Sequence, residues 1–122
     1  MHVKLQGFPR DLRLLKPVEF QRMFRAADCK SVDNNLTLLA CNNGVVHPRL
    51  GLAITKRVVR RAVDRNRIKR LVRESFRRHQ AELGGLDVVV LSRDGAAKSS
   101  NEELFKSLEK HWQRLAIRCA KS

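Results

Sequence analysis

One segment, residues 56–78, constrains the fold of this chain more than any other. Its 23 residues include eleven Lys or Arg and two acidic residues. From Ile68 onward, one set of residues recurs at the spacing of a single α-helical face, and a basic set occupies the opposite face. The first set is Ile68, Leu71, Val72, Ser75, Phe76 and His79, and the second is Asn66, Lys69, Arg70, Arg73 and Arg77. The sequence therefore predicts a long amphipathic helix with one buried face and one densely cationic face.

The cationic face indicates a polyanionic ligand. A charged helix face is usually just solvated, with acidic residues three or four positions from the basic ones. Here such partners are scarce, so the like charges repel one another along the helix. The formal net charge of the 122-residue chain is +14. Nucleic acid or an anionic membrane would relieve this repulsion, but the chain has no apolar run of about 18 residues for a membrane.

The N-terminal part predicts a basic lead-in and one short helix. Residues 1–16 are the lead-in, in which Arg10 and Arg13 are free to touch phosphate. Pro17 suits the first turn of a helix that continues to about residue 27. Its apolar stripe is Phe20, Met23, Phe24 and Ala27. Such a stripe usually packs into a core, but an aromatic ring at a groove edge also stacks on unpaired bases, so both readings stay open.

Three strands are expected, at residues 36–41, 49–55 and 86–91. The first two flank an Asn-Gly turn signal, so we expect them to pair antiparallel. On one face of the second strand lie the small residues Gly51, Ala53 and Thr55. That face either forms a shallow trough for an RNA backbone or packs closely against a helix. The third strand is apolar almost throughout and is of the buried type.

Two helix boundaries complete the prediction. The basic helix should end near Glu82, before two glycines. A break or a short extra turn is expected near Asp64, because Val58, Val59, Ala62 and Val63 are out of phase with Ile68, Leu71 and Val72. A last helix begins at Ser99 or Ser100, with glutamates at the capping-box positions. Its apolar face is Leu104, Leu108, Trp112 and Leu115, with Phe105 and His111 at the edges, and residues 117–122 form a frayed tail.

The sequence predicts no protein-borne catalytic site. Metal-dependent nucleases cluster carboxylates around Mg²⁺, whereas the twelve acidic residues here are scattered. His47 and His79 have no orienting partner nearby in sequence. The three cysteines, Cys29, Cys41 and Cys119, are widely spaced and odd in number, which favours reduced thiols and argues against zinc or a disulfide.

The element order is helix, strand, strand, helix, strand, helix. It predicts an α+β fold, a small two-layer sandwich with one sheet, in a single RNA-binding domain spanning residues 1–122. A strand-helix-strand connection between parallel strands is ordinarily right-handed.

Three stretches resemble the protein subunit of bacterial ribonuclease P. They are LGLAITKRVVRRAVDRNRIKRLVRESFR at residues 50–77, FPRDLRLLKPVEFQRMF at residues 8–24, and HPRLGL at residues 47–52. The RNRIKR core at residues 65–70 matches the signature of that family. The resemblance covers nearly the whole chain, and it implies a left-handed βαβ crossover in place of the usual right-handed one.

The resemblance also implies a function. The protein would bind the catalytic RNA and the 5′ leader of precursor tRNA in the cytoplasm, and so promote endonucleolytic removal of the leader. Catalysis, with Mg²⁺, would belong to the RNA subunit, so the resemblance implies no catalytic and no metal-binding residue in the protein. Implied contacts to the catalytic RNA are Arg65, Asn66, Arg67, Lys69, Arg70, Arg73 and Arg77. Implied leader contacts are Phe20, Phe24, Thr37, Leu39, Lys56 and Arg57, and candidate phosphate contacts are Arg10, Arg13, Arg60 and Arg61.

Leu39 departs from relatives that carry an aromatic residue there, so leader binding would rest more on charge. Two rival functions differ from this one. One is a ribosomal or assembly protein that binds structured RNA, and the other is a DNA-binding regulator with its basic helix in a major groove.

Overall fold

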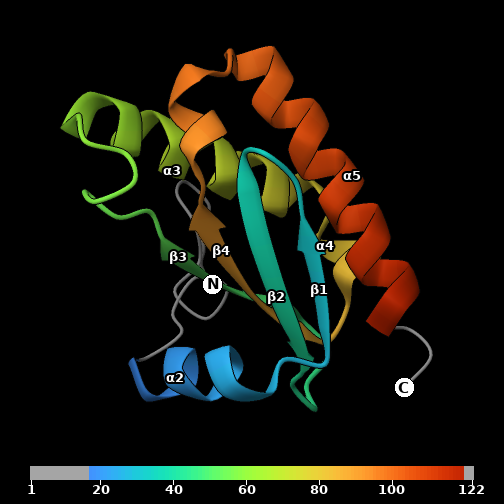
Figure 1. Cartoon of the computed structure of the whole chain (residues 1–122). Helices are drawn as coiled ribbons and strands as arrows, with labels where there is room; N and C mark the ends of the chain where they lie inside the picture. The colour runs from blue at the N-terminus through green and yellow to red at the C-terminus, as the bar shows by residue number, and fades with distance from the viewer. Residues whose placement is uncertain (1–16, 120–122) are drawn as a thin grey trace, which may run out of the picture.

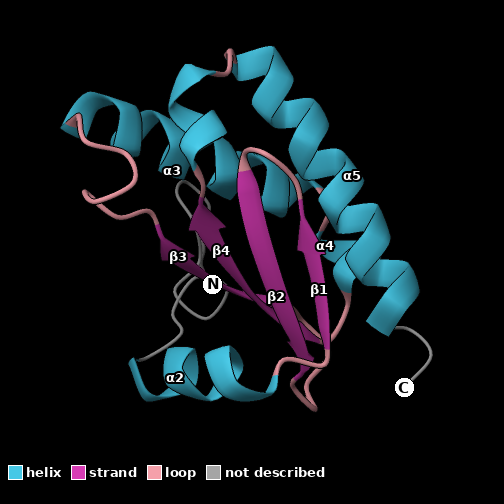
Figure 2. Cartoon of the chain, in the orientation of Figure 1, coloured by secondary structure: helices cyan, strands magenta, loops and turns pink. Residues whose placement is uncertain are grey.

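Four strands form one mixed sheet with helices on both of its faces (Figures 1 and 2). The computed structural model describes residues 17–119. The strands are β1 (Cys29–Val32), β2 (Leu36–Asn42), β3 (Arg49–Ala53) and β4 (Leu86–Ser92). The helices are α2 (Pro17–Ala26), α3 (Ala62–Arg78), α4 (Gln80–Leu83) and α5 (Asn101–Cys119), with a 3-10 helix, η1 (Asp94–Lys98). The predicted α+β class is confirmed, and no helix among the described residues is long and apolar enough to cross a membrane.

The apolar strand β4 lies between β2 and β3, antiparallel to β2 and parallel to β3. The expected antiparallel pairing of residues 36–41 with residues 49–55 is therefore wrong. The Asn-Gly turn signal does not close a hairpin, because Asn43 is tied to the start of β4. Its backbone N–H donates to the Gly85 carbonyl at 2.9 Å, and its Nδ2 donates to Asp87 Oδ1 at 2.9 Å. The left-handed sense of the β3-to-β4 crossover stays a prediction from the resemblance.

Strand β1 was not predicted from the sequence. It pairs antiparallel with β2 across a tight turn at Asp33, whose Oδ1 accepts the backbone N–H groups of Asn35 and Leu36 at 2.8 and 2.9 Å. Its sequence, CKSV, is short and half polar, which gives little strand signal. The resulting sheet order is β1-β2-β4-β3.

The two faces of the sheet are covered by different helices. On one face, Leu38, Val88 and Val90 are fully buried in the main core with residues of α3 and α5. On the other face, Met23 of α2 packs against Cys41 and Val89. This alternation follows from the two-residue period of strands. Figure 1 shows α2 on one side of the sheet, with α3 and α5 on the other.

Helix α3 runs without a break from Ala62 to Arg78, so a break near Asp64 is wrong, but a separate turn closed by the Thr55 carbonyl precedes the helix. Val58 and Val59 are out of phase because they precede the helix, where Val59 is buried in the preceding turn. The break lies instead at His79, between α3 and α4. Gly84, with a φ of 53°, follows α4, as the two glycines predicted.

The predicted apolar face of α3 is confirmed. Ile68, Leu71, Val72, Ser75 and Phe76 are all buried, and His79 is half-buried. The Phe76 ring meets Trp112 of α5 edge-on, with ring centroids 5.8 Å apart. Trp112 Nε1 donates to Ser75 Oγ at 2.8 Å, which satisfies a buried polar group on each helix.

Helix α5 begins with the predicted capping box. The Ser100 N–H donates to Glu103 Oε1 at 2.8 Å, and the Glu103 N–H donates to Ser100 Oγ at 3.1 Å. The helix extends to Cys119. The prediction of a frayed tail from residue 117 is therefore wrong for residues 117–119, which are helical.

The expectation of three reduced thiols is also wrong. Cys29 of β1 and Cys119 of α5 form a disulfide, with Cα atoms 6.1 Å apart, within the usual range. A separation of 90 residues conceals this proximity from sequence spacing. Cys41 is free and buried, and burial raises the pKa of its thiol.

A buried polar network joins the β1–β2 turn to α5. Ser31 Oγ lies 2.6 Å from His111 Nδ1, and His111 Nε2 lies 3.0 Å from Asp33 Oδ2. Ser107 donates to the same Asp33 oxygen at 2.5 Å, and Arg114 Nη1 donates to Ser31 Oγ at 3.3 Å. Burial lowers the pKa of His111 despite the attraction of Asp33, so the buried ring is neutral near pH 7.

The neutral state of His111 predicts a pH-dependent stability. Because its folded pKa is depressed, its contribution is complete above the ordinary value of 6.5 and is lost as pH falls below it. We expect the midpoint of thermal unfolding to fall between pH 7.5 and pH 5.5. The fall should be smaller in His111→Gln, because a glutamine side chain does not titrate. The nearby Arg114 and Arg118 also disfavour a protonated His111 ring. Equal falls in both proteins would contradict the assignment.

Candidate nucleic-acid interface

The middle of α3 presents several cations and few acidic neighbours. Asn66, Arg70 and Arg77 are exposed, and Lys69 and Arg73 are half-buried at the edges of the same face. Both carboxylates of the helix are engaged near its ends. Arg61 Nε lies 3.7 Å from Asp64 Oδ2, and Arg78 Nη2 lies 2.8 Å from Glu74 Oε2. Arg70, Arg73 and Arg77 have no ion-pair partner among residues 17–119, so their charge is directed outward.

Two arginines of the signature triplet instead bind other parts of the chain. Arg65 Nη1 donates to the carbonyl oxygens of Val59 at 3.0 Å and of Arg60 at 2.9 Å. Arg67 Nη1 donates to Asn101 Oδ1 at 2.9 Å, and its Nη2 donates to the Ala97 carbonyl at 3.4 Å. Arg65 thus holds the turn before α3, and Arg67 holds α3 to η1 and α5. Sequence reasoning assigned both to RNA and missed these roles.

The residues expected to bind a leader lie on the α2 side of the sheet. Thr37 and Leu39 of β2 are half-buried, and Leu39 packs with Phe20 against the small cluster around Met23. Phe24 is 51% exposed, with its ring centroid 6.4 Å from that of Phe20. Phe20 is therefore largely a packing residue, and Phe24 offers an exposed ring.

The remaining predicted contacts lie around the turn that follows β3. Lys56, Arg57, Arg60 and Arg61 are all exposed. The turn is closed at its base, where the Thr55 carbonyl accepts the N–H groups of Val58 and Val59 at 3.3 and 2.9 Å. Arg10 and Arg13 lie outside the described residues.

A buried ion pair lies at the end of the sheet opposite to the turn that follows β3, and it was not predicted from the sequence. Asp87 is fully buried on β4, and Arg49 of β3 grips it with Nε at 2.8 Å and Nη2 at 2.7 Å. Arg22 of α2 approaches to 4.0 Å, but its exposure makes that contact weak. The aspartate within the buried-type strand could have indicated this ion pair from the sequence, because acidic residues are seldom fully buried without a partner.

The Ser-His-Asp arrangement at the β1–β2 turn is structural. Ser31, His111 and Asp33 have the residue types of a hydrolase triad. Ser31 is 1% exposed and His111 is fully buried, so a substrate cannot reach the hydroxyl. Among the described residues, no three His, Cys, Asp or Glu side chains gather as metal ligands.

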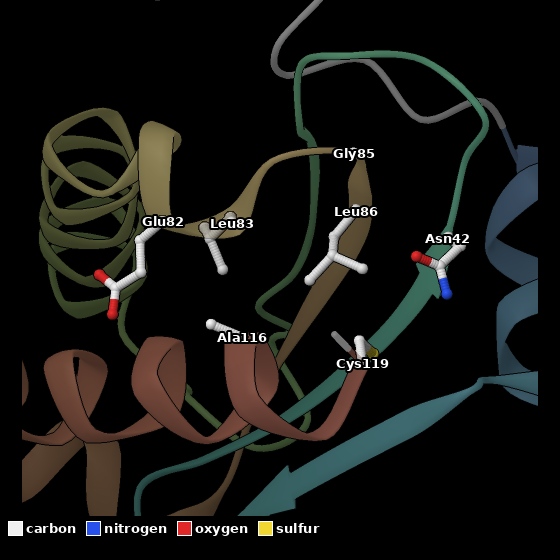
Figure 3. Close-up of a pocket in the computed structure, with 7 residues that line it drawn as sticks. All are labelled: Asn42, Glu82, Leu83, Gly85, Leu86, Ala116 and Cys119. Atoms are coloured by element: carbon white, nitrogen blue, oxygen red, sulfur yellow. The ribbon is translucent and has the colours of Figure 1, made fainter. Parts of the chain in front are cut away.

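A cavity of about 170 Å³ lies beside the C-terminal end of α5 (Figure 3). Its lining contains one charged residue, Glu82, whose carboxylate lies at one edge of the group of labelled residues. The other lining residues are Asn42, Leu83, Gly85, Leu86, Ala116 and Cys119. With an acidic group and no basic one, this cavity is not suited to phosphate.

Comparison with known proteins identifies relatives of this chain. Residues 8–116 match the Ribonuclease P family. The ribonuclease P protein component of Methylococcus capsulatus is 54% identical over 116 residues, which are 95% of this chain and 90% of that protein. The corresponding protein of Pseudoalteromonas atlantica is 52% identical and covers 95% of this chain and 96% of its own length.

Solved structures share the same fold. The RNase P protein of Staphylococcus aureus superposes with a TM-score of 0.75 at 31% identity, over 85% of this chain and 94% of that one. The RNase P protein of Thermotoga maritima superposes with a TM-score of 0.74 at 26% identity, over 84% and 96% of the two chains.

The inward role of Arg65 predicts an effect on stability without any ligand. Arg65→Ala removes the charged donor from two backbone carbonyls and should lower the free energy of unfolding by about 1–2 kcal/mol. Arg70→Ala, on the same helix but directed outward, should change it by less than about 0.5 kcal/mol. Urea denaturation of the free protein measures both values. A loss for Arg65→Ala no larger than that for Arg70→Ala would refute the bracing role.

Proposed function

The chain belongs to the ribonuclease P protein family and is the protein subunit of that endoribonuclease, and from this premise we propose how it works. It binds the catalytic RNA through the outward face of α3. It binds the 5′ leader of precursor tRNA on the α2 side of the sheet. Holding both partners promotes endonucleolytic removal of the leader.

One observation carries the assignment of the RNA-binding face. Arg70 and Arg77 are exposed, Arg73 lies half-buried beside them, and none of the three has an ion-pair partner in the described part of the chain. A guanidinium fork matches phosphate oxygens in two parallel hydrogen bonds, so this row suits an RNA backbone. Asn66, exposed on the first turns of the same helix, adds a donor and an acceptor that can bridge phosphate and sugar.

The leader site rests on chemistry that suits unpaired nucleotides. Single-stranded binders combine a cationic surface with aromatic rings on which bases stack. Phe24 supplies an exposed ring, and Lys56 and Arg57 supply charge at the end of β3. Leu39 offers no ring, so the leader gains less from stacking there and more from charge.

Bond cleavage in this proposal belongs to the RNA subunit, which would hold Mg²⁺ together with the substrate phosphates. The protein residues bind and orient. Supporting this division, the acidic residues of α3 and the β1–β2 turn are engaged within the chain. Asp64 and Glu74 pair with arginines, and Asp33 accepts four short contacts.

We propose a cytoplasmic location, because the proposed role is in the processing of precursor tRNA. Disulfides are uncommon in that compartment, so RNA binding in this proposal is not assigned to the Cys29–Cys119 bond.

The first experiment tests the α3 face. The double variant Arg70→Ala/Arg73→Ala should bind the ribonuclease P RNA more weakly. Its log–log salt slope should be shallower by about one for each phosphate that the variant no longer binds, because fewer counterions are released. Filter binding across a salt series measures both quantities.

Lys106→Ala/Lys110→Ala is the matched control, because it removes the same charge from exposed positions of α5. It should leave affinity and slope close to those of the wild type, and thermal melts confirm that both variants fold. If both double variants lose affinity equally, the effect is one of net charge, and the α3 face is not the site. If the wild type binds duplex DNA or ribosomal RNA as tightly as ribonuclease P RNA, a rival function is favoured.

The second experiment tests the leader site. Phe24→Ala should weaken binding of precursor tRNA to the holoenzyme roughly tenfold, since base–aromatic stacking contributes about 1–3 kcal/mol. Mature tRNA, which has no leader, should bind as before. Val18→Ala, which trims another exposed apolar residue of α2, serves as the control. An equal loss for precursor and mature tRNA would show that Phe24 does not contact the leader.

A further inference from the structure

A hollow of about 330 Å³ lies beside the N-terminal end of α3, apart from the outward row of arginines. It is bounded by the turn that precedes α3 and by η1. Its lining residues are Val58, Arg60, Arg61, Asp64, Asp94, Ala97 and Lys98. The volume falls in the range of about 300–1,000 Å³ that is typical of small-ligand sites.

Arg65 and Arg67 hold the two walls of this hollow. Arg65 binds the carbonyl oxygens of Val59 and Arg60 in the first wall. Arg67 binds the carbonyl oxygen of Ala97 in the second wall, and Asn101 just beyond it. Because a guanidinium group holds the backbone of each wall, the walls are already ordered before binding. Less conformational entropy is therefore lost when a ligand binds.

The lining combines a cationic rim with apolar surface. Arg60, Arg61 and Lys98 are exposed, whereas Val58 and Ala97 are half-buried. Asp64 is engaged by Arg61 at 3.7 Å. The exposed Asp94 belongs to the η1 wall, and a carboxylate there suits the amino group of a base rather than a phosphate. Cations for phosphate, apolar surface for a ring face and a carboxylate for a base edge together match one nucleotide.

We propose that this hollow holds one unpaired nucleotide of the catalytic RNA, with its phosphate on the basic rim and its base against Val58 and Ala97. The nucleotide is unpaired because a base within a duplex does not expose its ring face to a protein surface. The partner is RNA by virtue of the function proposed above. The site is additional to the α3 face, because η1 contributes one of its walls.

Lys98→Ala tests the hollow without touching α3. Binding of the ribonuclease P RNA should weaken roughly tenfold, the scale of one charge-assisted hydrogen bond. The log–log salt slope should become shallower by about 0.7, the value for one single-strand phosphate. Lys106→Ala removes an exposed α5 lysine outside the hollow, 3.7 Å from Glu102, and should match the wild type.

Asn101→Ala tests the wall without changing the charge. It removes the side-chain acceptor of Arg67, so affinity should fall while the salt slope stays as in the wild type. Wild-type affinity in this variant would overturn the bracing role of Arg67. RNA carrying 4-thiouridine should crosslink to the peptide that contains η1 at an unpaired nucleotide, and crosslinks at paired nucleotides only would overturn the proposal.

The Arg70→Ala/Arg73→Ala variant, measured in parallel, distinguishes a failure of the hollow from a failure of the proposed function. If it loses affinity while Lys98→Ala binds as the wild type does, the hollow is refuted and the α3 face stands. If neither variant changes RNA binding, the proposed function fails and the hollow fails with it.

Discussion

Burial of one face of α3 is the interaction on which the rest of the structure depends. The helix carries a row of like charges, and each like-charged pair at helical spacing costs about 0.2–0.5 kcal/mol. Burying a large apolar side chain such as Ile68, Leu71 or Phe76 contributes about 1.5–3 kcal/mol. Packing therefore outweighs repulsion. The edge-on contact between Phe76 and Trp112 locks α3 to α5, so the cationic face is presented on a rigid support.

The basic residues around α3 divide by where their hydrogen bonds go. Arg65 and Arg67 direct their donors to backbone carbonyls and to Asn101, and thereby shape the surface beside the helix. Arg70 and Arg73 lack such partners within residues 17–119 and carry the outward charge. A lysine could not replace Arg65 or Arg67, because only a planar guanidinium offers several donors in a fixed fork.

Two buried polar groups hold the sheet at opposite ends. Asp87 joins β4 to β3 and to the loop after β2, with Arg49 as its bidentate partner. His111 joins α5 to the β1–β2 turn through Ser31 and Asp33. Breaking one partner of such a group leaves the other buried and unpaired, which costs more than the contact itself contributes. The placement of α2 and α3 on opposite faces follows instead from the two separate apolar clusters into which these helices pack.

The sequence by itself determined the elements whose signals are local. The 3.6-residue period placed the buried face of α3, the serines and glutamates of residues 99–103 marked the start of α5, and the RNRIKR run indicated the family. The tertiary structure decided what joins distant residues: that β4 separates β2 from β3, that Cys29 meets Cys119, and that Arg65 turns inward. The reason is physical, because periodicity shows which face of an element is buried but does not specify what packs against it.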